Sequence, residues 1–387
     1  MTVVPSRALG IAALLLLAGC GSNRPDEEGS VLVDSAGVQL AMASAVDRPL
    51  GWSLTEVFRL GGADEGPGSF TAASTFNTGT DAAGNLYVFD TQQYRVEVFG
   101  PTGEHLRFLG RQGGGPGELE FPISMFVTPP GIVHVFDVAK RSLVRWDANG
   151  DLLPPLSMQG VAFGSIRVFG DTVVFDQQVR TPELRSSRLL QVIGTDTLAI
   201  DSLSAPGGGM VQFSCVAFAA APVFAPSLQW ATDGRQVAAT RQTPYQVDVY
   251  RDGVLVRSVR RPITPKPATT EDIARLHPEG MKISFGGGGG CTIPASEIME
   301  KQGVAPHVPQ IRGVILDPQG RLWVERYTFA DEPDLVDLFN AEGHYLGTLT
   351  GKGPPLGFIG DAVVLFAEED AATGMIQVVA YRVEPAN

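Results

Sequence analysis

The chain has 387 residues, of which 44% are hydrophobic and 8% aromatic, with 46 glycines and 28 prolines. This composition is too apolar for a disordered chain, and it is typical of many short strands joined by tight turns. The formal net charge of −13 argues against nucleic acid as a partner, because phosphate binding requires a basic surface.

The first residues have the pattern of a targeting segment. Arg7 is the only charged residue before an apolar run that ends in Leu17-Ala18-Gly19-Cys20. The run is too short for a transmembrane helix. Its ending resembles the lipobox of bacterial lipoproteins, and this resemblance implies cleavage before Cys20 and lipidation of that residue. An ordinary secretory signal cleaved elsewhere is the alternative.

We therefore expect residues 1–19 to be a signal peptide. Residues 20–45 would form a lipid-anchored tether that ends in two short strands, and several acyl chains would hold this anchor stably. Gly21 follows the cysteine in place of Asp, which by the same resemblance favours the outer membrane. The expected location is the bacterial cell envelope, facing the periplasm or the cell surface.

Two cysteines remain after Cys20 is set aside. Cys215 and Cys291 form an even pair in a chain that we expect to be exported, and this predicts a disulfide between them. Two unpaired buried thiols are the alternative.

A strand and the turn that follows it recur along the chain. The four clear copies are VEVFGPTGEHLRFL, LVRWDANGDLLPPL, VDVYRDGVLVRSV and VDLFNAEGHYLGTL, with their aromatic residues at Phe99, Trp146, Tyr250 and Phe339. Phe99 and Trp146 are 47 residues apart, whereas Trp146 and Tyr250 are 104 apart, which leaves room for one more copy. A period of this size indicates a propeller or a repeat array.

The repeat predicts an all-β fold over residues 46–387, a six-bladed β-propeller of four-stranded antiparallel blades. Weaker strands between residues 165 and 203 supply the blade missing from the clear copies. Only three strands remain after Phe339, one fewer than a blade needs. The alternating segment at about 52–60 has no hairpin partner nearby, so we expect it to join the last blade and close the ring.

Residues 261–310 depart from the repeat and predict an insertion between the fourth and fifth blades. Thr269, followed by Glu271 and Asp272, has the pattern of a helix start, and a second helix is expected from Ser296 to Gln302. Five glycines at 286–290 lie between the two helices.

One blade carries a recognisable motif. Asp90 ends a strand, Arg95 begins the next, and alternating apolar residues lead to Phe99. This pattern resembles the NHL repeat, and Asp137 and Arg141 follow it in the next blade. With its glycine- and proline-rich links, the chain resembles bacterial lipoproteins known only as six-bladed β-propellers. The resemblance implies the fold and supplies no activity.

Motifs of catalysis and metal binding are not found in the sequence. GxSxG, HExxH and CxxC do not occur. Residues 147–151 begin like a calcium loop but lack its later Gly and Glu, so we interpret them as a hairpin turn. The five histidines do not occupy three matching blade positions, as the zinc sites of propeller lyases would require, and Asn77 has no equivalents for a calcium-lactonase site. We predict no catalytic residue, metal ligand or cofactor.

One rim of the propeller carries the links between blades, the loops between second and third strands, and the insertion. The candidate ligand-binding residues on this rim and in the channel are Gln92, Tyr94, Arg111, Arg167, Arg312, Arg326 and Tyr327. Arginines around the pore of an acidic protein would suit an anionic ligand. Alternatively, these arginines pair with carboxylates at blade edges, such as Asp90 and Asp137.

The sequence thus favours a membrane-anchored, monomeric, extracytoplasmic protein that binds or scaffolds a protein, peptide or glycan. Two alternatives stay open: a metal-dependent propeller lyase or lactonase-type hydrolase with its site at the channel mouth, and a purely structural envelope protein. The sequence favours a binding role over an enzymatic one and leaves the ligand open.

Overall fold

The computed structural model describes residues 30–385, apart from residues 64–65, 71, 75–76, 159–164, 170–171, 181–183, 194–195, 207–208 and 286–288. Residues 1–29, with the predicted signal peptide, Cys20 and nearly all of the tether, lie outside the described residues. In the part that is described, no helix is long and apolar enough to cross a membrane.

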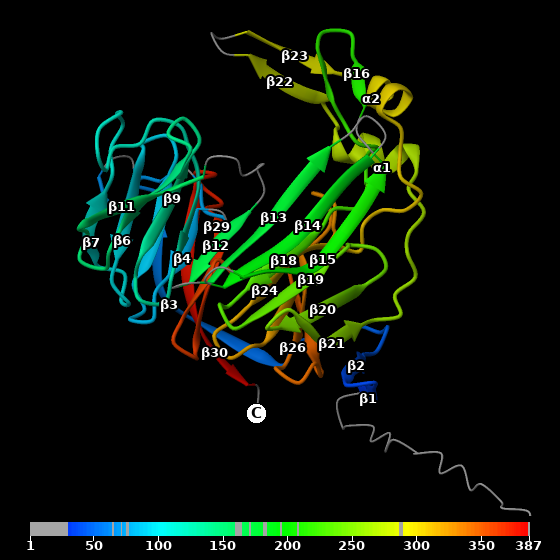
Figure 1. Cartoon of the computed structure of the whole chain (residues 1–387), viewed down its shortest axis with the longest axis horizontal. Helices are drawn as coiled ribbons and strands as arrows, with labels where there is room; N and C mark the ends of the chain where they lie inside the picture. The colour runs from blue at the N-terminus through cyan, green and yellow to red at the C-terminus, as the bar shows by residue number, and fades with distance from the viewer. Residues whose placement is uncertain are drawn as a thin grey trace, which may run out of the picture.

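Six sheets of antiparallel strands form a ring (Figure 1). In blades 1 to 5 the chain runs from the innermost strand to the outermost one. Blade 1 contains β4 (Thr78–Thr80), β5 (Leu86–Asp90), β6 (Arg95–Phe99) and β7 (His105–Leu109); blade 2 contains β8 (Pro122–Val127), β9 (Val133–Asp137), β10 (Ser142–Trp146) and β11 (Leu152–Ser157); blade 3 contains β12 (Ile166–Phe169), β13 (Thr172–Arg180), β14 (Leu184–Ile193) and β15 (Asp196–Pro206).

The second half of the ring repeats this order. Blade 4 contains β18 (Gln229–Thr232), β19 (Gln236–Thr240), β20 (Gln246–Arg251) and β21 (Val254–Arg260); blade 5 contains β24 (Ile311–Leu316), β25 (Leu322–Arg326), β26 (Leu335–Phe339) and β27 (Tyr345–Thr350); blade 6 contains β28 (Gly357–Ile359), β29 (Val363–Glu369), β30 (Ile376–Pro385) and β3 (Trp52–Gly61). The predicted all-β, six-bladed propeller is confirmed.

The N-terminal strand closes the ring as predicted. β3 pairs antiparallel with β30, from Trp52 opposite Pro385 to Gly61 opposite Gln377. This pairing gives the last blade its outer strand, and it joins a strand from before blade 1 to the last strand of the chain within one sheet.

The short strands before β3 also belong to the propeller. β1 (Val31–Ser35) and β2 (Val38–Met42) form a hairpin, and β2 pairs in parallel with β21 at the outer edge of blade 4. Residues 48–50 then hydrogen-bond to Thr348 in β27 of blade 5. Residues 30–61, the N-terminal strap, therefore hold the outer edges of blades 4, 5 and 6. We expected these two strands to belong to the tether. The parallel pairing of β2 with β21 joins segments that are too far apart in sequence to leave a local pattern.

A hydrophobic cluster lies between each pair of adjacent blades. The repeated aromatic residues lie at the end of the third strand, or one residue before it, and all are buried: Phe99, Trp146, Tyr250 and Phe339. Strand side chains point alternately to the two faces of a blade, so each blade contributes to two clusters. The repeat therefore encodes the packing of one blade on the next.

A buried charge network joins blades 4 and 5. The carboxylate of Asp337 accepts hydrogen bonds from Tyr245 Oη at 2.6 Å, Arg261 Nη1 at 2.7 Å and Thr348 Oγ1 at 2.6 Å. Both Asp337 and the Arg261 side chain are fully buried. Arg261 also binds Asp47 in the N-terminal strap, at 2.8 Å. A buried ion pair with several added hydrogen bonds fixes how these two blades and the strap meet.

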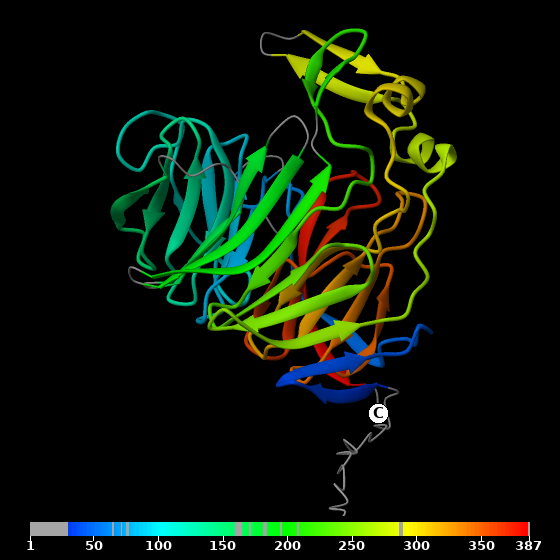
Figure 2. The ribbon, with the colours of Figure 1, turned by 45° about the vertical axis from the view of Figure 1, so that its right-hand side comes forward.

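Two excursions from the ring form an accessory subdomain, residues 209–225 and 262–310, on one side of the propeller (Figures 1 and 2). It contains β16 (Met210–Gln212), β17 (Ala217–Ala219), α1 (Thr270–Leu276), β22 (Met281–Phe285), β23 (Gly289–Ile293) and α2 (Ala295–Gln302). Its own hydrophobic cluster includes Phe213, Phe224, Ile273, Ile293 and Ile298, together with Phe329 from blade 5. A disulfide between Cys215 and Cys291 joins the two excursions, with an S–S distance of 2.08 Å.

Local signals place the two helices where the sequence predicts them. The hydroxyl of Thr269 accepts from the backbone N–H of Asp272, whose carboxylate accepts in return from the backbone N–H of Thr269, which is a capping box. α2 ends at Gly303, whose φ of +78° favours glycine. The first excursion was not predicted: the sequence analysis treated 261–310 as the only departure from the repeat.

Candidate functional site

Inner strands of four blades enclose a cavity of about 830 Å³ in the channel of the propeller. Most of its lining comes from β12, β18, β24 and β28. Asp176 of β13, Glu325 of β25 and the links into blades 1 and 6, residues 73–74 and 353–356, add to it. A cavity of this volume accommodates a small organic molecule. Because every inner strand contributes to one channel, side chains from blades far apart in the sequence meet there.

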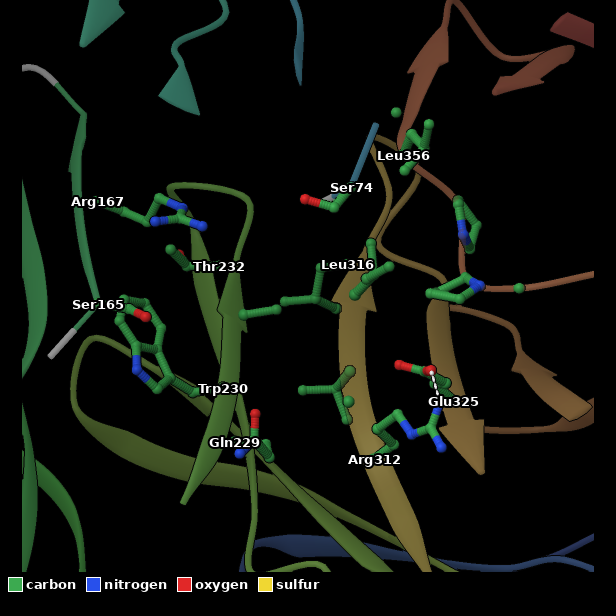
Figure 3. A pocket seen from close by; sticks show the side chains of 18 of the residues that line it. Ser74, Ser165, Arg167, Gln229, Trp230, Thr232, Arg312, Leu316, Glu325 and Leu356 are labelled. Atoms are coloured by element: carbon green, nitrogen blue, oxygen red, sulfur yellow. Dashed lines mark ion pairs between the residues drawn. The ribbon is translucent and has the colours of Figure 1, made fainter. Parts of the chain in front are cut away.

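Polar groups gather at the end of the cavity where the inner strands begin. Ser165 precedes β12, Ser227 precedes β18, and Gln229 is the first residue of β18. The segments that lead into β18 and β24 include the two excursions of the accessory subdomain, so this end of the channel lies on the side of that subdomain. Trp230 and Leu316 supply apolar wall (Figure 3).

Arg167 extends from β12 into the cavity (Figure 3). Its guanidinium lies 5.3 Å from the centroid of the Phe126 ring, and its Nη1 donates to the carbonyl oxygen of Ile166 at 2.8 Å. Burial lowers the pKa of Arg167 to about 10, and the negative charge of Asp176 offsets only part of this effect. Arg167 therefore presents a half-buried cation whose five N–H donors are only partly used.

Arg312 and Glu325 lie together on another wall, apart from Arg167 (Figure 3). Nη1 of Arg312 is 3.6 Å from Oε1 of Glu325, and its Nη2 donates to the carbonyl oxygen of Thr328 at 2.5 Å. Burial raises the pKa of Glu325 to about 7 against the attraction of Arg312, and the nearby charge of Asp334 adds to the rise. Glu325 therefore gains and loses a proton near neutral pH.

Asp176 organises the wall between blades 3 and 4. Its Oδ1 accepts from the backbone N–H of Ser165 at 2.5 Å and from Nε1 of Trp230 at 3.2 Å. These bonds fix the indole of Trp230 at the cavity wall and orient the residue that precedes β12. Asp176 thus serves the cavity by positioning its neighbours.

The charged groups of the cavity make it locally positive or neutral. Arg167 and Arg312 supply two positive charges, Asp176 supplies one negative charge, and Glu325 supplies another only when it is ionised. The formal charge of the cavity is therefore +1 below the pKa of Glu325 and zero above it. This contrasts with the net charge of −13 on the whole chain and favours an anionic over a cationic ligand.

The seven residues predicted to bind ligand do not come together. Arg167 and Arg312 line the cavity, whereas Gln92, Tyr94 and Arg111 lie outside it. Arg111 is largely exposed and pairs with Glu118, Nη2 to Oε1, at 2.7 Å. Gln92 and Tyr94 belong to the turn between β5 and β6, where the φ of Tyr94 is +56°. These three residues follow the blade repeat, which places them away from the channel axis.

The other two predicted residues lie near Arg312 without lining the cavity. Nη1 of Arg326 binds Asp47 Oδ2 of the N-terminal strap at 2.7 Å. The ring of Tyr327 packs in the hydrophobic cluster of the accessory subdomain, and its centroid lies 5.0 Å from the guanidinium of Arg312. Tyr327 therefore connects the cavity with that subdomain.

The alternative partners proposed for the arginines were the wrong carboxylates. Asp90 accepts from the backbone N–H groups of Gln92 and Gln93, and Asp137 accepts from the backbone N–H groups of Glu120, Phe121 and Lys140. Both carboxylates stabilise turns, as Asp commonly does. The arginines on this rim pair with other acids, which belong to links and to the N-terminal strap.

The positions that the sequence singled out for possible metal binding make other contacts. Among the described residues, no group of three or more His, Cys, Asp and Glu side chains could hold a metal ion. Asn77 donates from Nδ2 to two backbone carbonyls, at 3.0 and 3.1 Å. Buried His134 stacks on Phe126 with ring centroids 4.4 Å apart, and burial lowers its pKa to about 3. Asp147 accepts from two backbone N–H groups of its own turn.

Sequence reasoning missed Glu325, Trp230 and Asp176. One signal could have found Glu325: strands β5 and β9 have Phe89 and Phe136 at the corresponding position, before their final Asp. A carboxyl group that replaces a repeated aromatic residue marks a position freed from blade packing. Asp176 lies in blade 3, whose copy of the repeat is weak, and Trp230 lies on an inner strand, outside the third strand and turn that the clear copies share.

The fold and the cavity define a class, a six-bladed β-propeller with a charged channel large enough for a small ligand. The sequence matches no protein-family model and no curated protein. A protein described as exported, from Bacteroides fragilis NCTC 9343, has a similar structure, with a TM-score of 0.51 and 11% identity over 89% of this chain and 99% of that one. A member of the DUF4221 family from Bacteroides vulgatus ATCC 8482 has a TM-score of 0.54 and 11% identity over 88% of this chain and 100% of that one. At these identities the likeness shows the fold alone.

Proposed function

We propose that this protein is an extracytoplasmic binding protein that holds a small molecule, or the end of a peptide or glycan, in the channel of the propeller. One observation carries the proposal: the cavity of about 830 Å³ places Arg167, most of whose N–H donors are unused, next to the wall that Trp230 lines. Ligand pockets combine apolar walls with a few well-placed polar groups in this way. The rigid ring preorganises the pocket, which lowers the entropic cost of binding.

A second function, an enzyme at the channel mouth, is favoured by a single observation. The pKa of Glu325 is raised to about 7, and a carboxyl of this kind suits general acid or base catalysis. The metal-dependent version of this function has less support, because the described residues offer no cluster of metal ligands. A binding role requires only the groups that the cavity presents.

The proposed location is the bacterial cell envelope, with a lipid anchor at Cys20. The described chain begins next to β1, and Figure 1 shows β1 and the accessory subdomain at opposite ends of the molecule. The ten residues from Cys20 to the buried Ser30 can span at most roughly 36 Å. An anchor at Cys20 would therefore hold the β1 end near the membrane and direct the polar end of the channel away from it.

Fluorine NMR tests the binding role at the cavity itself. The chain has four tryptophans, and of these only Trp230 lines the cavity, while Trp52 and Trp323 pack between blades 5 and 6 and Trp146 packs between blades 1 and 2. Protein labelled with 5-fluorotryptophan is mixed with a small-molecule extract of the cell envelope. We expect the Trp230 signal, assigned with Trp230→Phe, to shift while the other three stay in place. An unchanged Trp230 signal would refute the proposal.

A further inference from the structure

The charges of the cavity indicate the chemistry of its ligand. We propose, building on the proposed binding function, that the ligand enters the channel with a single carboxylate that binds Arg167, while its body lies against Trp230. The source of the carboxylate is the C-terminus of a short peptide or the acid group of a sugar.

Arg167 is the cation of the cavity that is most available to an anionic ligand. Among the described residues it forms no ion pair, and its one hydrogen bond runs to the neighbouring backbone carbonyl of Ile166, which leaves most of its donors for a ligand. A planar guanidinium matches a carboxylate through two parallel hydrogen bonds, and such charge-assisted bonds are about twice as strong as neutral ones. Arg312 is less available, because it already contacts Glu325, the carbonyl of Thr328 and the ring of Tyr327.

The charge balance selects a monoanion over a phosphate. Asp176 and Glu325 also line the cavity, so its formal charge does not exceed +1. One carboxylate neutralises this charge, whereas a phosphate ester with nearly two negative charges would leave an excess facing two acidic side chains. The surrounding lining offers polar partners as well, from Ser165, Ser227 and Gln229, for amide or hydroxyl groups next to the carboxylate.

Trp230 provides the surface for the body of the ligand. Its indole is held by the hydrogen bond to Asp176, 3.2 Å from Nε1 to Oδ1, so its orientation is set before a ligand arrives. Figure 3 shows Arg167 and Trp230 on neighbouring walls of the same space, with Thr232 between them. A ligand bound to Arg167 would therefore bring its adjoining atoms to the indole.

The test uses the four-tryptophan fluorine spectrum with matched probes. The mature protein is titrated with N-acetylated tripeptides that end in a free acid, with the same peptides as C-terminal amides, with a uronic acid disaccharide and its neutral counterpart, and with inorganic phosphate. We expect the acids of at least one source to shift the Trp230 signal and their neutral counterparts to bind at least tenfold more weakly, the equivalent of about 1.4 kcal/mol. Phosphate is expected to compete poorly.

Variants separate binding from folding. Arg167→Gln should weaken binding of the acids by at least about tenfold, and Arg167→Lys should restore part of it, because a point charge replaces the planar fork. Arg111→Gln, an exposed arginine outside the cavity, is the matched control and should bind like the wild type.

The outcomes distinguish the two proposals. Response to peptide acids alone identifies a peptide terminus, and response to the uronic acid alone identifies an acidic sugar. Equal binding of acids and their neutral counterparts, or unchanged binding by Arg167→Gln, would overturn the carboxylate assignment. If the envelope extract shifts Trp230 but no acid does, the assignment is wrong and the binding function stands. If nothing shifts Trp230, the binding function itself is wrong.

Discussion

The carboxyl group of Glu325 should make folding stability fall as the pH rises from about 4.5 to about 7. Its side chain is largely buried, and its pKa is about 7 in the folded protein against an ordinary value of 4.5. The folded state therefore holds a proton that the unfolded state has released between pH 4.5 and 7. Each pKa unit corresponds to about 1.4 kcal/mol, so the ionised form costs the folded state about 3 kcal/mol above pH 7, and this cost vanishes below pH 4.5.

Replacing Glu325 by Gln removes the titration and keeps the shape of the side chain. At pH 8, Glu325→Gln should be more stable than the wild type by about 3 kcal/mol, because the pKa of about 7 already includes the attraction of Arg312. At pH 4.5 the two proteins should differ by less than about 1 kcal/mol. Urea unfolding measures both differences, and Glu342→Gln, an exposed carboxyl on a turn, is the control.

Two results would contradict this reasoning. One is a parallel pH dependence of unfolding for the wild type and Glu325→Gln. The other is a Glu325 carboxyl carbon that titrates near pH 4.5 in NMR of the folded protein. Either would mean that the attraction of Arg312, 3.6 Å away, offsets the whole effect of burial on the Glu325 carboxylate.

Three further perturbations test the scaffold that holds the cavity. Asp337→Ala leaves the buried guanidinium of Arg261 without its carboxylate and should lower the free energy of unfolding by about 3–5 kcal/mol, measured by urea unfolding. A loss below about 1 kcal/mol would show that water replaces the carboxylate. Replacing Cys215 and Cys291 by Ser removes a disulfide between residues 76 positions apart. Amide hydrogen exchange should then become faster in the accessory subdomain but not in blades 1 and 2, and equal acceleration everywhere would contradict this. Deleting residues 30–61 exposes the edge of β30 and should cause concentration-dependent association in sedimentation, whereas a monomer would refute the role of the strap.

The network around Asp337 shows how the repeat was adapted at one blade interface. Corresponding third strands place Glu97 in blade 1 and Asp248 in blade 4 at the same position, and both are buried. Glu97 accepts from the backbone N–H of Gly68 and pairs with Arg95, within its own blade and link. Asp337 instead binds Arg261 from the preceding blade. The position is acidic in three of the four clear copies of the repeat, with Val144 in blade 2, and in blade 5 it connects blades 4 and 5.

The N-terminal strap explains why the ring needs more than one closing strand. β3 completes blade 6, while β2 and residues 48–50 pair with the outer strands of blades 4 and 5. Outer strands have free backbone N–H and C=O groups that invite association. Covering three of these edges with one segment protects them and couples the N-terminus to the half of the ring that contributes Arg312 and Glu325.

The number of blades and the order of their strands were predictable from the sequence alone. Alternating apolar residues, turn glycines and repeated aromatic residues are local patterns, and each strand carries enough of them to be counted. The helix starting at Thr269 was equally local, because a capping box lies within four residues. Pairing of β3 with β30 followed from the count, since a blade of three strands leaves one edge open.

Which residues line the cavity became clear from the three-dimensional structure and not from the sequence. Arg167 and Arg312 are 145 positions apart in the chain, and nothing in their neighbours shows that they share a cavity while Arg111 and Arg326 do not. The parallel pairing of β2 with β21 and the first excursion of the accessory subdomain also depend on partners far away in sequence. Local patterns fix the backbone of each blade, whereas the distance of a side chain from the channel axis depends on how six blades close into a ring.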